Sequence, residues 1–213
     1  MKTADVIARL AQLRLVPVIT LENAADARPL AEALLAGGLP CAEVTFRTAA
    51  ALEAIGIMAQ VPGLLVGAGT VLKPEQAQAA ADAGAQFIVT PGFNPRVVSY
   101  CVSHGIPITP GVSNPTLIEM ALEHGLDVVK FFPAEASGGL PYLKAIAAPY
   151  GAMRYIPTGG IEPSNLRDYL AFPKIVACGG SWMVKPELLK ARDWAKITAL
   201  AADAVALAQS AKK

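Results

Sequence analysis

The sequence predicts an α/β protein whose parallel strands close into a (β/α)8 barrel, and three observations support this fold class. Eight short apolar runs alternate with Ala- and Leu-rich stretches of helical spacing, an alternation typical of parallel strands connected by helices. Gly63, Gly84, Gly105 and Gly125 stand 21, 21 and 20 residues apart, at expected helix ends where glycine accepts a left-handed backbone. Proline recurs near the expected helix starts, where its missing N–H does no harm.

A helix is expected first, over Thr3–Leu13, before strand one. Most of the eight strands are continuous apolar runs, as expected where both faces of a parallel strand are buried. The expected strands are Leu15–Ile19, Ala42–Phe46, Leu64–Ala68, Gln86–Val89, Ile106–Thr109, Asp127–Phe131, Arg154–Ile156 and Ile175–Cys178. The expected helices between and after them are Ala24–Ala36, Thr48–Gln60, Pro74–Ala83, Pro95–His104, Pro115–His124, Leu140–Ala147, Pro163–Leu170 and Trp194–Gln209.

An open doubly wound sheet is the competing fold. Its dinucleotide-binding form carries G-x-G-x-x-G. Gly67 and Gly69 match the first two glycines of this motif, but Leu72 occupies the position of the third. The 213 residues lie near the lower limit of about 200 for the barrel, and no linker divides them. We therefore expect one (β/α)8 domain over residues 1–213, with an N-terminal helix before strand one.

Composition argues against several classes of protein. Apolar residues make up 54% of the chain and charged residues 16%, the reverse of a disordered composition. The net charge of +1 comes without a basic tract, so no nucleic-acid partner is expected. No apolar run reaches the ~18 residues of a membrane span, and residues 1–15 lack the pattern of a signal peptide. We therefore expect a cytoplasmic protein without a membrane partner.

The cysteines and histidines do not form a cluster. Cys41, Cys101 and Cys178 are widely spaced, and no C-x-x-C is present, so we expect reduced, buried thiols rather than a zinc site or a disulfide framework. His104 and His124 each precede a glycine at an expected helix end. This is a capping context, so neither is assigned to catalysis and no metal is expected.

Lys130 stands out because it interrupts an apolar strand near its carboxyl end, where a barrel places its functional groups. Burial disfavours the charged form of a lysine, and a neutral amine attacks ketones to form a Schiff base. The residues alone also allow a lysine that extends past the strand end to solvent or pairs with a carboxylate. Both interpretations stay open on this evidence.

Glu43, Thr45 and Arg47 share one face of the second strand, because strand side chains alternate. Strands two and six are opposite each other in an eight-stranded barrel, whose interior barely holds its own side chains. We therefore expect Glu43 to face Lys130 across a small substrate. A buried Glu43–Arg47 pair with a structural role is the alternative.

Glycine pairs follow strands seven and eight, at 159–160 and 179–180. The loops after these strands form the usual phosphate site of a barrel, and glycine lets backbone N–H groups approach an anion closely. A short helix expected near Ser181 would add its dipole. The small residues that end strands three to five, among them Thr70 and Pro91, match ordinary turn chemistry when taken alone.

Five motifs between Pro17 and Trp182 together resemble the bacterial class I 2-keto-3-deoxy-6-phosphogluconate (KDPG) aldolases, which often also act on 2-keto-4-hydroxyglutarate (KHG). The motifs are Glu43-Val44-Thr45-Phe46-Arg47-Thr48, Gly67-Ala68-Gly69-Thr70-Val71, Lys130-Phe131-Phe132-Pro133-Ala134-Glu135, Pro157-Thr158-Gly159-Gly160-Ile161 and Gly179-Gly180-Ser181-Trp182. Phe46 departs from the family pattern, in which Leu is common, and so does the stretch 91–94. We expect Phe46 to point away from the Glu43 face.

The resemblance implies a role for each site residue. Lys130 would form the Schiff base and Glu43 would act as general acid and base. The pyruvyl carboxylate would be surrounded by Arg47, Thr70 and Thr158, with Phe132 packed over it, and Pro91 would also contact the substrate. The phosphate would be held by Gly159, Gly160, Gly180 and Ser181. The resemblance further implies a homotrimer that acts on a phosphorylated 2-keto sugar acid without a cofactor or a metal.

The implied reaction is the cleavage of KDPG to pyruvate and glyceraldehyde 3-phosphate, with the cleavage of KHG to pyruvate and glyoxylate as a second activity. One alternative is an aldolase for the galactonate epimer, but that relative usually has Val where Thr158 stands. A second alternative is an isomerase or epimerase of a phosphorylated sugar. A third is a non-catalytic sugar-phosphate binding protein, which would need the glycine pairs but not Lys130.

Overall fold

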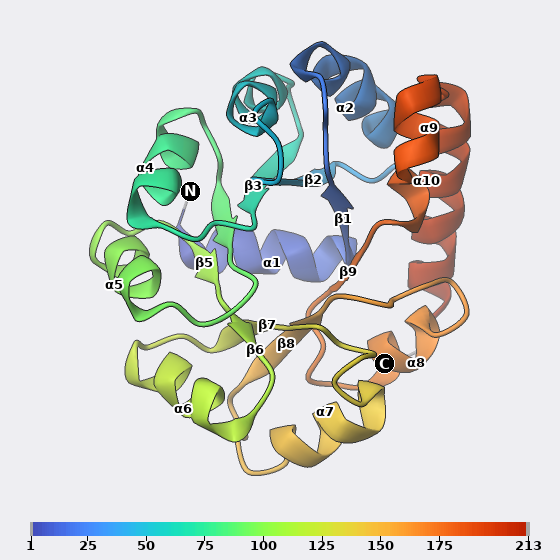
Figure 1. Ribbon diagram of the computed structural model, residues 1–213. Coiled ribbons are helices and arrows are strands. Elements are labelled where there is room, and N and C mark those ends of the chain that lie inside the picture. Colours follow the sequence, from blue (N-terminus) through green and yellow to red (C-terminus); the bar gives the residue numbers. More distant parts are fainter. Residues whose placement is uncertain (1, 212–213) are drawn as a thin grey trace.

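The computed structural model describes residues 2–211, and strands and helices alternate along it as predicted (Figure 1). The helices are α1 (Thr3–Leu13), α2 (Ala27–Ala36), α3 (Ala51–Ala59), α4 (Pro74–Asp82), α5 (Pro95–Ser103), α6 (Pro115–Glu123), α7 (Gly139–Ala147), α8 (Leu166–Ala171), α9 (Pro186–Ala191) and α10 (Trp194–Ser210), with 3-10 turns η1 (Ala24–Asp26) and η2 (Trp182–Val184). The strands are β1 (Leu15–Ile19), β2 (Cys41–Thr45), β3 (Leu65–Gly69), β4 (Phe87–Val89), β5 (Ile108–Thr109), β6 (Gly111–Val112), β7 (Val128–Phe131), β8 (Arg154–Pro157) and β9 (Cys178–Gly180). None of the helices within residues 2–211 is both long and apolar enough to cross a membrane.

The strands pair in parallel and form two sheets. Six strands form a half-barrel in the order β5-β4-β3-β2-β1-β9, and three form a second sheet in the order β6-β7-β8. Single parallel bridges from Thr158 to Gly179 and from Tyr155 to Ile175 join the two sheets on one side. On the other side, only Pro110 separates β5 from β6 along the chain.

The sequence predicted one continuous set of eight strands, and Pro110 divides this set into two sheets. The expected strand Ile106–Thr109 is shortened to β5 and resumes as β6 after the proline, because proline has no N–H to donate to a ladder. The Pro110 carbonyl still accepts the Lys130 N–H at 2.9 Å. The Gly111 N–H bonds to the Thr90 side chain instead of a strand carbonyl, at 3.3 Å.

Other differences from the predicted boundaries also have local causes. Helix α8 begins at Leu166 rather than Pro163, because Asn165 Oδ1 accepts the Glu162 N–H at 2.9 Å and holds these residues in a turn. The last strand begins at Cys178 rather than Ile175, since Cys178, Gly179 and Gly180 pair with β1. Helix α9 was not predicted, although the proline at its first position is a known start signal.

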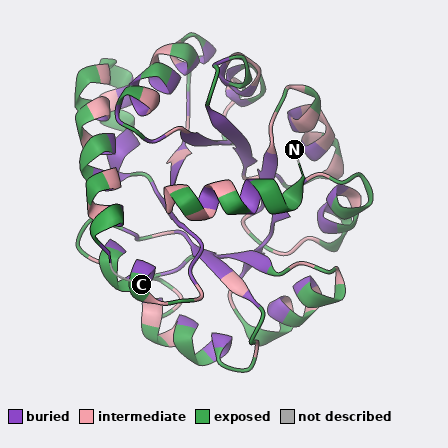
Figure 2. Cartoon of the chain, turned by 180° about the vertical axis from the view of Figure 1, so that it is seen from behind, coloured by how far each residue is buried: buried purple, intermediate pink, exposed green. Residues whose placement is uncertain are grey.

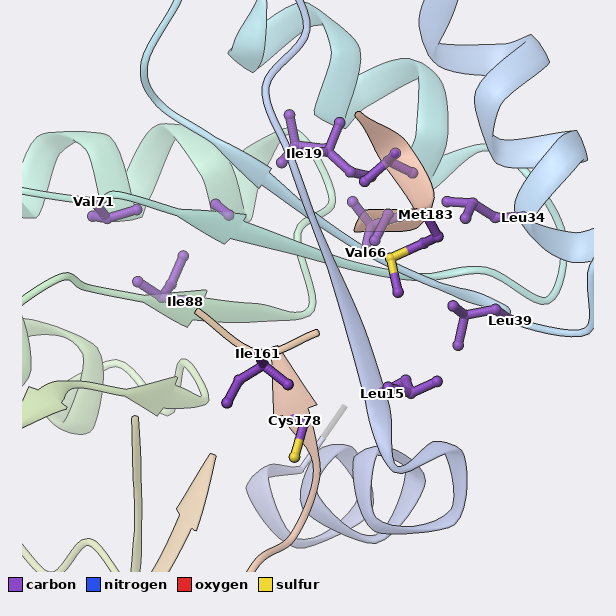
Figure 3. Packing of buried hydrophobic residues seen from close by; sticks show 14 of the residues in the cluster. Leu15, Ile19, Leu34, Leu39, Val66, Val71, Ile88, Ile161, Cys178 and Met183 are labelled. Carbon is purple, nitrogen blue, oxygen red and sulfur yellow. The ribbon is translucent and has the colours of Figure 1, made fainter. Parts of the chain in front are cut away.

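Apolar side chains form two clusters, one on each face of the strands, as strand alternation requires. The larger cluster fills the layer between strands and helices, where Val66 and Met183 lie near Leu34 of α2 (Figure 3). Phe46 packs against this cluster, away from Glu43 as expected. The smaller cluster consists of Val6, Ile7, Leu10, Val16, Cys41, Leu65, Phe87, Val89, Val128, Ile156, Val176 and Ala177. The helices are buried only on the sides that face the strands (Figure 2).

Helix α1 crosses one end of the strands (Figures 1 and 2). Val6, Ile7 and Leu10 pack into the smaller cluster, and β1 starts directly after the helix, so α1 covers the amino ends of the strands. The Arg14 guanidinium that follows it donates to the Ala208 and Ala211 carbonyls at 2.7 and 2.8 Å. With the amino ends closed, access to the strands is left at their carboxyl ends.

The cysteines and histidines are structural, as predicted. All three cysteines are buried free thiols, and burial raises the pKa of Cys41 and of Cys101 to about 12, so both stay protonated at neutral pH. His104 and His124 are the C-cap residues of α5 and α6. Their Nδ1 atoms donate to helix carbonyls at 2.8 and 2.9 Å.

Gly67→Ala is expected to destabilise the protein by roughly 1–3 kcal/mol, because a Cβ added at Gly67 in β3 would overlap the buried ring of Phe87. Gly56→Ala is the matched control, since the nearest atom to its added Cβ is 3.9 Å away and alanine is favoured inside a helix by about 0.5–1 kcal/mol. Denaturant unfolding of both variants measures the difference. A Gly67→Ala protein as stable as Gly56→Ala would contradict the close packing at β3.

Candidate active site

Strands β2 and β7 bring Glu43 and Lys130 together across the smaller cluster. Lys130 Nζ lies 3.4 Å from Glu43 Oε1, although the residues are 87 positions apart. Both are buried, with exposures of 6% for Lys130 and 3% for Glu43. The prediction that Glu43 faces Lys130 is therefore confirmed, and the Glu43 carboxylate is paired with Lys130 rather than with Arg47.

Neighbouring residues hold this pair in place. Lys130 Nζ lies 5.1 Å from the centre of the Phe132 ring, within the range of a cation–π contact. On the other side, a Cβ added at Gly69 of β3 would overlap the Glu43 carboxylate. Only glycine at position 69 leaves the carboxylate room to point toward the amine.

The pair lines a very small cavity of about 10 Å³. It has polar walls at Glu43, Lys130, Thr109 and Thr158, and apolar walls at Leu10, Val16, Phe87, Val89 and Ile156. A space of this size holds about one water molecule. The apolar walls keep bulk water away from the Lys130 amine, which is buried.

A larger cavity of about 220 Å³ opens at the carboxyl ends of β1, β8 and β9. Seven of the predicted site residues line it, namely Arg47, Phe132, Thr158, Gly159, Gly160, Gly180 and Ser181. Thr158 lines both cavities, and its buried Oγ1 has no hydrogen-bond partner within residues 2–211. A buried hydroxyl without a partner costs about 1–3 kcal/mol, so this oxygen is poised to bond a group that enters the cavity.

The loop after β8 has a conformation that only glycine adopts easily. Gly159 and Gly160 have φ values of 97° and 78°, in the left-handed region. Asn165 Nδ2 donates to the Gly160 carbonyl at 2.9 Å, and Asn165 Oδ1 holds the Glu162 N–H. Because a trans peptide points its C=O and N–H to opposite sides, this leaves the N–H of Ile161, a cavity-lining residue, on the side away from Asn165.

Ser181 begins the short helix that the sequence predicted after strand eight. That helix is a single 3-10 turn, η2, and the Ser181 side chain makes no capping hydrogen bond to it. Ser181 is exposed and lines the larger cavity. Its hydroxyl is thus available to a ligand without disturbing the turn behind it.

Two predicted residues, Thr70 after β3 and Pro91 after β4, line neither of the two cavities. Thr70 has a left-handed φ of 56°, which is unfavourable for a β-branched residue. The structure therefore brings together nine of the predicted site residues, the seven in the larger cavity and the Lys130–Glu43 pair, and leaves these two outside.

Sequence reasoning missed two residues that shape the larger cavity. Thr20 lines it directly, and its place immediately after the first apolar strand was a usable signal, since barrel sites lie at strand ends. Asn165 holds the glycine loop from behind through its side-chain amide. Its position in an expected helix gave no hint of this role.

Comparisons with known proteins agree with this geometry. A family model described as KDPG and KHG aldolase matches residues 6–200. The 2-dehydro-3-deoxy-phosphogluconate aldolase of Treponema pallidum is 56% identical over 192 residues, which cover 90% of this chain and 91% of that protein.

Two solved structures share the fold and much of the sequence. The 2-keto-3-deoxy-6-phosphogluconate aldolase of Zymomonas mobilis ZM4 with 3-phosphoglycerate has a TM-score of 0.88 at 45% identity, covering 97% of this chain and 96% of that one. The KDPG aldolase from Legionella pneumophila, with pyruvate captured as a covalent carbinolamine intermediate, has a TM-score of 0.90 at 39% identity, covering 93% and 97%. With a family model over most of its length and relatives of this identity, the chain belongs to the KDPG and KHG aldolase family.

Proposed function

We propose that this protein is a class I aldolase that cleaves KDPG to pyruvate and glyceraldehyde 3-phosphate through a Schiff base on Lys130, with KHG as a second substrate. The observation that carries the proposal is the buried contact of 3.4 Å between Lys130 Nζ and Glu43 Oε1. A Schiff-base aldolase needs an amine and a proton-transfer group within reach of each other. A phosphosugar isomerase or a binding protein has no need of a buried amine at this position.

We propose that the two sheets act as one closed (β/α)8 barrel, within a single aldolase domain. The bridges between Thr158 and Gly179 and between Tyr155 and Ile175 support closure on one side. On the other side, β5 and β6 count as one strand interrupted at Pro110. This count yields eight strands, and the shared smaller cluster then becomes the barrel interior.

The first chemical steps follow from the pair. Lys130 gives a proton to Glu43, and its neutral Nζ attacks the C2 ketone of the substrate to form a carbinolamine. Glu43 returns the proton to the C2 oxygen, which leaves as water. The product is a cationic iminium at C2, which withdraws electrons from the adjacent carbon chain.

Cleavage uses the same carboxylate as a base. Glu43, through a water molecule, takes the proton of the C4 hydroxyl, the electrons of the C3–C4 bond move toward the iminium, and the aldehyde departs as glyceraldehyde 3-phosphate. Glu43 then protonates C3 of the remaining enamine. Hydrolysis of the resulting iminium releases pyruvate and restores Lys130.

The larger cavity supplies the anion contacts in this proposal. Arg47 and the Thr158 hydroxyl serve the pyruvyl carboxylate, with Phe132 packed beside it. The glycine N–H groups and Ser181 serve the phosphate, because a backbone without side chains admits close approach of an anion. Thr70, which directly follows the Gly69 that lies against Glu43, and Pro91 after β4 remain proposed substrate contacts at the carboxyl ends of their strands.

We also propose a homotrimer in the cytoplasm. The family resemblance supports the trimer, and the three buried free thiols fit a reducing compartment. Light scattering of the purified protein measures the oligomeric state directly.

Borohydride reduction in the presence of pyruvate is expected to modify the peptide that contains Lys130 and to inactivate the enzyme. Lys130→Arg should be inactive, because a guanidinium stays protonated and forms no imine. Lys73→Arg, at an exposed lysine, is the matched control and should keep full activity. Peptide mass mapping identifies the modified residue, and modification at another lysine would refute the assignment.

Glu43→Gln is expected to form the pyruvate imine more slowly, but still to accumulate it on long incubation, and to lose cleavage by ~10²–10⁴-fold, the usual contribution of a general acid–base group. The amide keeps the size of the side chain but cannot take up a proton. Exchange of the pyruvate methyl protons with D₂O, followed by NMR, should fall by the same order. Exchange at the native rate would show that Glu43 has another role.

Ser181→Ala is expected to reduce kcat/KM for KDPG by the equivalent of about 1–2 kcal/mol, the value of one charge-assisted hydrogen bond. Ser181→Asp should be far more damaging, since its carboxylate would repel the phosphate. Both losses should be small with KHG, which carries no phosphate. Equal losses on KDPG and KHG would mean that Ser181 shapes the catalytic centre rather than the phosphate site.

A further inference from the structure

Thr20 ends a short chain of hydrogen bonds whose direction is set by chemistry. The Thr45 hydroxyl donates to the Ile19 carbonyl at 2.8 Å, and Thr20 Oγ1 lies 2.9 Å from Thr45 Oγ1. A hydroxyl has one proton to donate, and a carbonyl has none. Since the Thr45 hydroxyl donates its proton to the Ile19 carbonyl, the Thr20 hydroxyl must be the donor in the hydrogen bond between the two threonines.

The Thr20 oxygen is therefore left as an acceptor. Its proton points toward Thr45, which is fully buried, and both lone pairs of its oxygen are free to accept hydrogen bonds. A group that bonds to this oxygen must be a donor such as a hydroxyl. A phosphate or carboxylate oxygen would meet a lone pair and be repelled.

This acceptor lies on the wall of the larger cavity. Thr20 follows β1, which pairs with β9 on one side and with β2 on the other. Thr20 thus stands between the Gly180–Ser181 end of the cavity and the strand that carries Glu43. The same cavity is lined by Arg47 and by the glycine loops that are proposed to bind the phosphate.

We propose that Thr20 is a specificity-determining residue that accepts a hydrogen bond from the C5 hydroxyl of KDPG. The substrate has hydroxyls at C4 and C5, and the C4 proton leaves toward Glu43 during cleavage. The C5 hydroxyl, next to the phosphate-bearing carbon, is the remaining donor. KHG has a carboxylate at this carbon, so Thr20 favours KDPG over KHG. This inference rests on the proposed function.

The first test compares Thr20→Val, which keeps the shape but removes the oxygen, with Thr20→Ser, which restores a hydroxyl. Thr20→Val should lower kcat/KM for KDPG on the order of tenfold. It should not lower kcat/KM for KHG, whose C5 carboxylate no longer meets a lone pair, and it should slow methyl-proton exchange of pyruvate less than it slows KDPG cleavage. Thr20→Ser should recover most of the loss. Equal losses on KDPG and KHG would overturn the C5 assignment.

The second test runs the reaction in the direction of condensation, with pyruvate and three aldehydes. Glyceraldehyde 3-phosphate carries the hydroxyl that becomes the C5 hydroxyl, 3-phosphooxypropanal lacks it, and the 2-fluoro analogue replaces it with an atom that accepts but cannot donate. The native protein should prefer the hydroxyl aldehyde on the order of tenfold over the deoxy compound. For each aldehyde, the condensation rate of the native protein is divided by that of Thr20→Val, so that the electronic effect of fluorine cancels. This ratio should be high for the hydroxyl aldehyde and near unity for the other two.

The outcomes separate this inference from the proposed function. A native protein that neither traps pyruvate on Lys130 nor cleaves KDPG would refute the function itself. A native protein that does both, yet uses hydroxyl and deoxy aldehydes equally, would refute the role of Thr20 alone. This comparison of aldehydes uses only the native protein, so it tests the role of Thr20 even if Thr20→Val folds poorly.

Discussion

The rest of the site depends on two opposite charges buried against each other between β2 and β7. Removing Lys130 and Glu43 from water is unfavourable, and their attraction offsets that cost only if they stay close and well oriented. Their contact of 3.4 Å therefore demands a rigid frame. Gly69 leaves room for the carboxylate, and the Phe132 ring stands beside the amine.

The Lys130–Glu43 pair is buried within the strands, whereas the glycine loops lie at the carboxyl ends of the strands. Helix α1 closes the amino ends of the strands and contributes Leu10 to the wall around the pair, so the reactive groups lie in an apolar surrounding. The carboxyl ends carry the glycine loops, which line a wider cavity together with Ser181. Thr158 lines both cavities, and it therefore lies between the Lys130–Glu43 pair and the glycine loops.

Recognition in the wider cavity depends on the direction of hydrogen bonds as well as on charge. The loops and Arg47 present donors, which suit a phosphate or a carboxylate. Thr20 presents an acceptor, because Thr45 and the Ile19 carbonyl determine where its proton points. One wall with donors and an acceptor side by side distinguishes a hydroxylated, phosphorylated chain from a short dicarboxylate.

The sequence by itself was sufficient for the features that local rules govern. The glycines at helix ends, the alternation of strands and helices and the capping histidines follow from periodicity and local geometry. The glycine pairs also marked the correct end of the strands. These features depend on residue type and on the spacing of residues, and both can be read from the amino-acid sequence. The contact of Glu43 with Lys130 was expected only on the assumption of a barrel, and the tertiary structure decided it.

The tertiary structure alone decided the features that depend on which backbone groups meet. The proton of Thr20 is directed by the Thr45 hydroxyl, which only the register of β1 and β2 brings near Thr20 and the Ile19 carbonyl. The interruption at Pro110 and the hydrogen bond from Asn165 to Gly160 are local, but the residue pattern did not indicate either of them. Contacts between distant segments, and the hydrogen-bond partners that they create, do not follow from the spacing of residues along the chain.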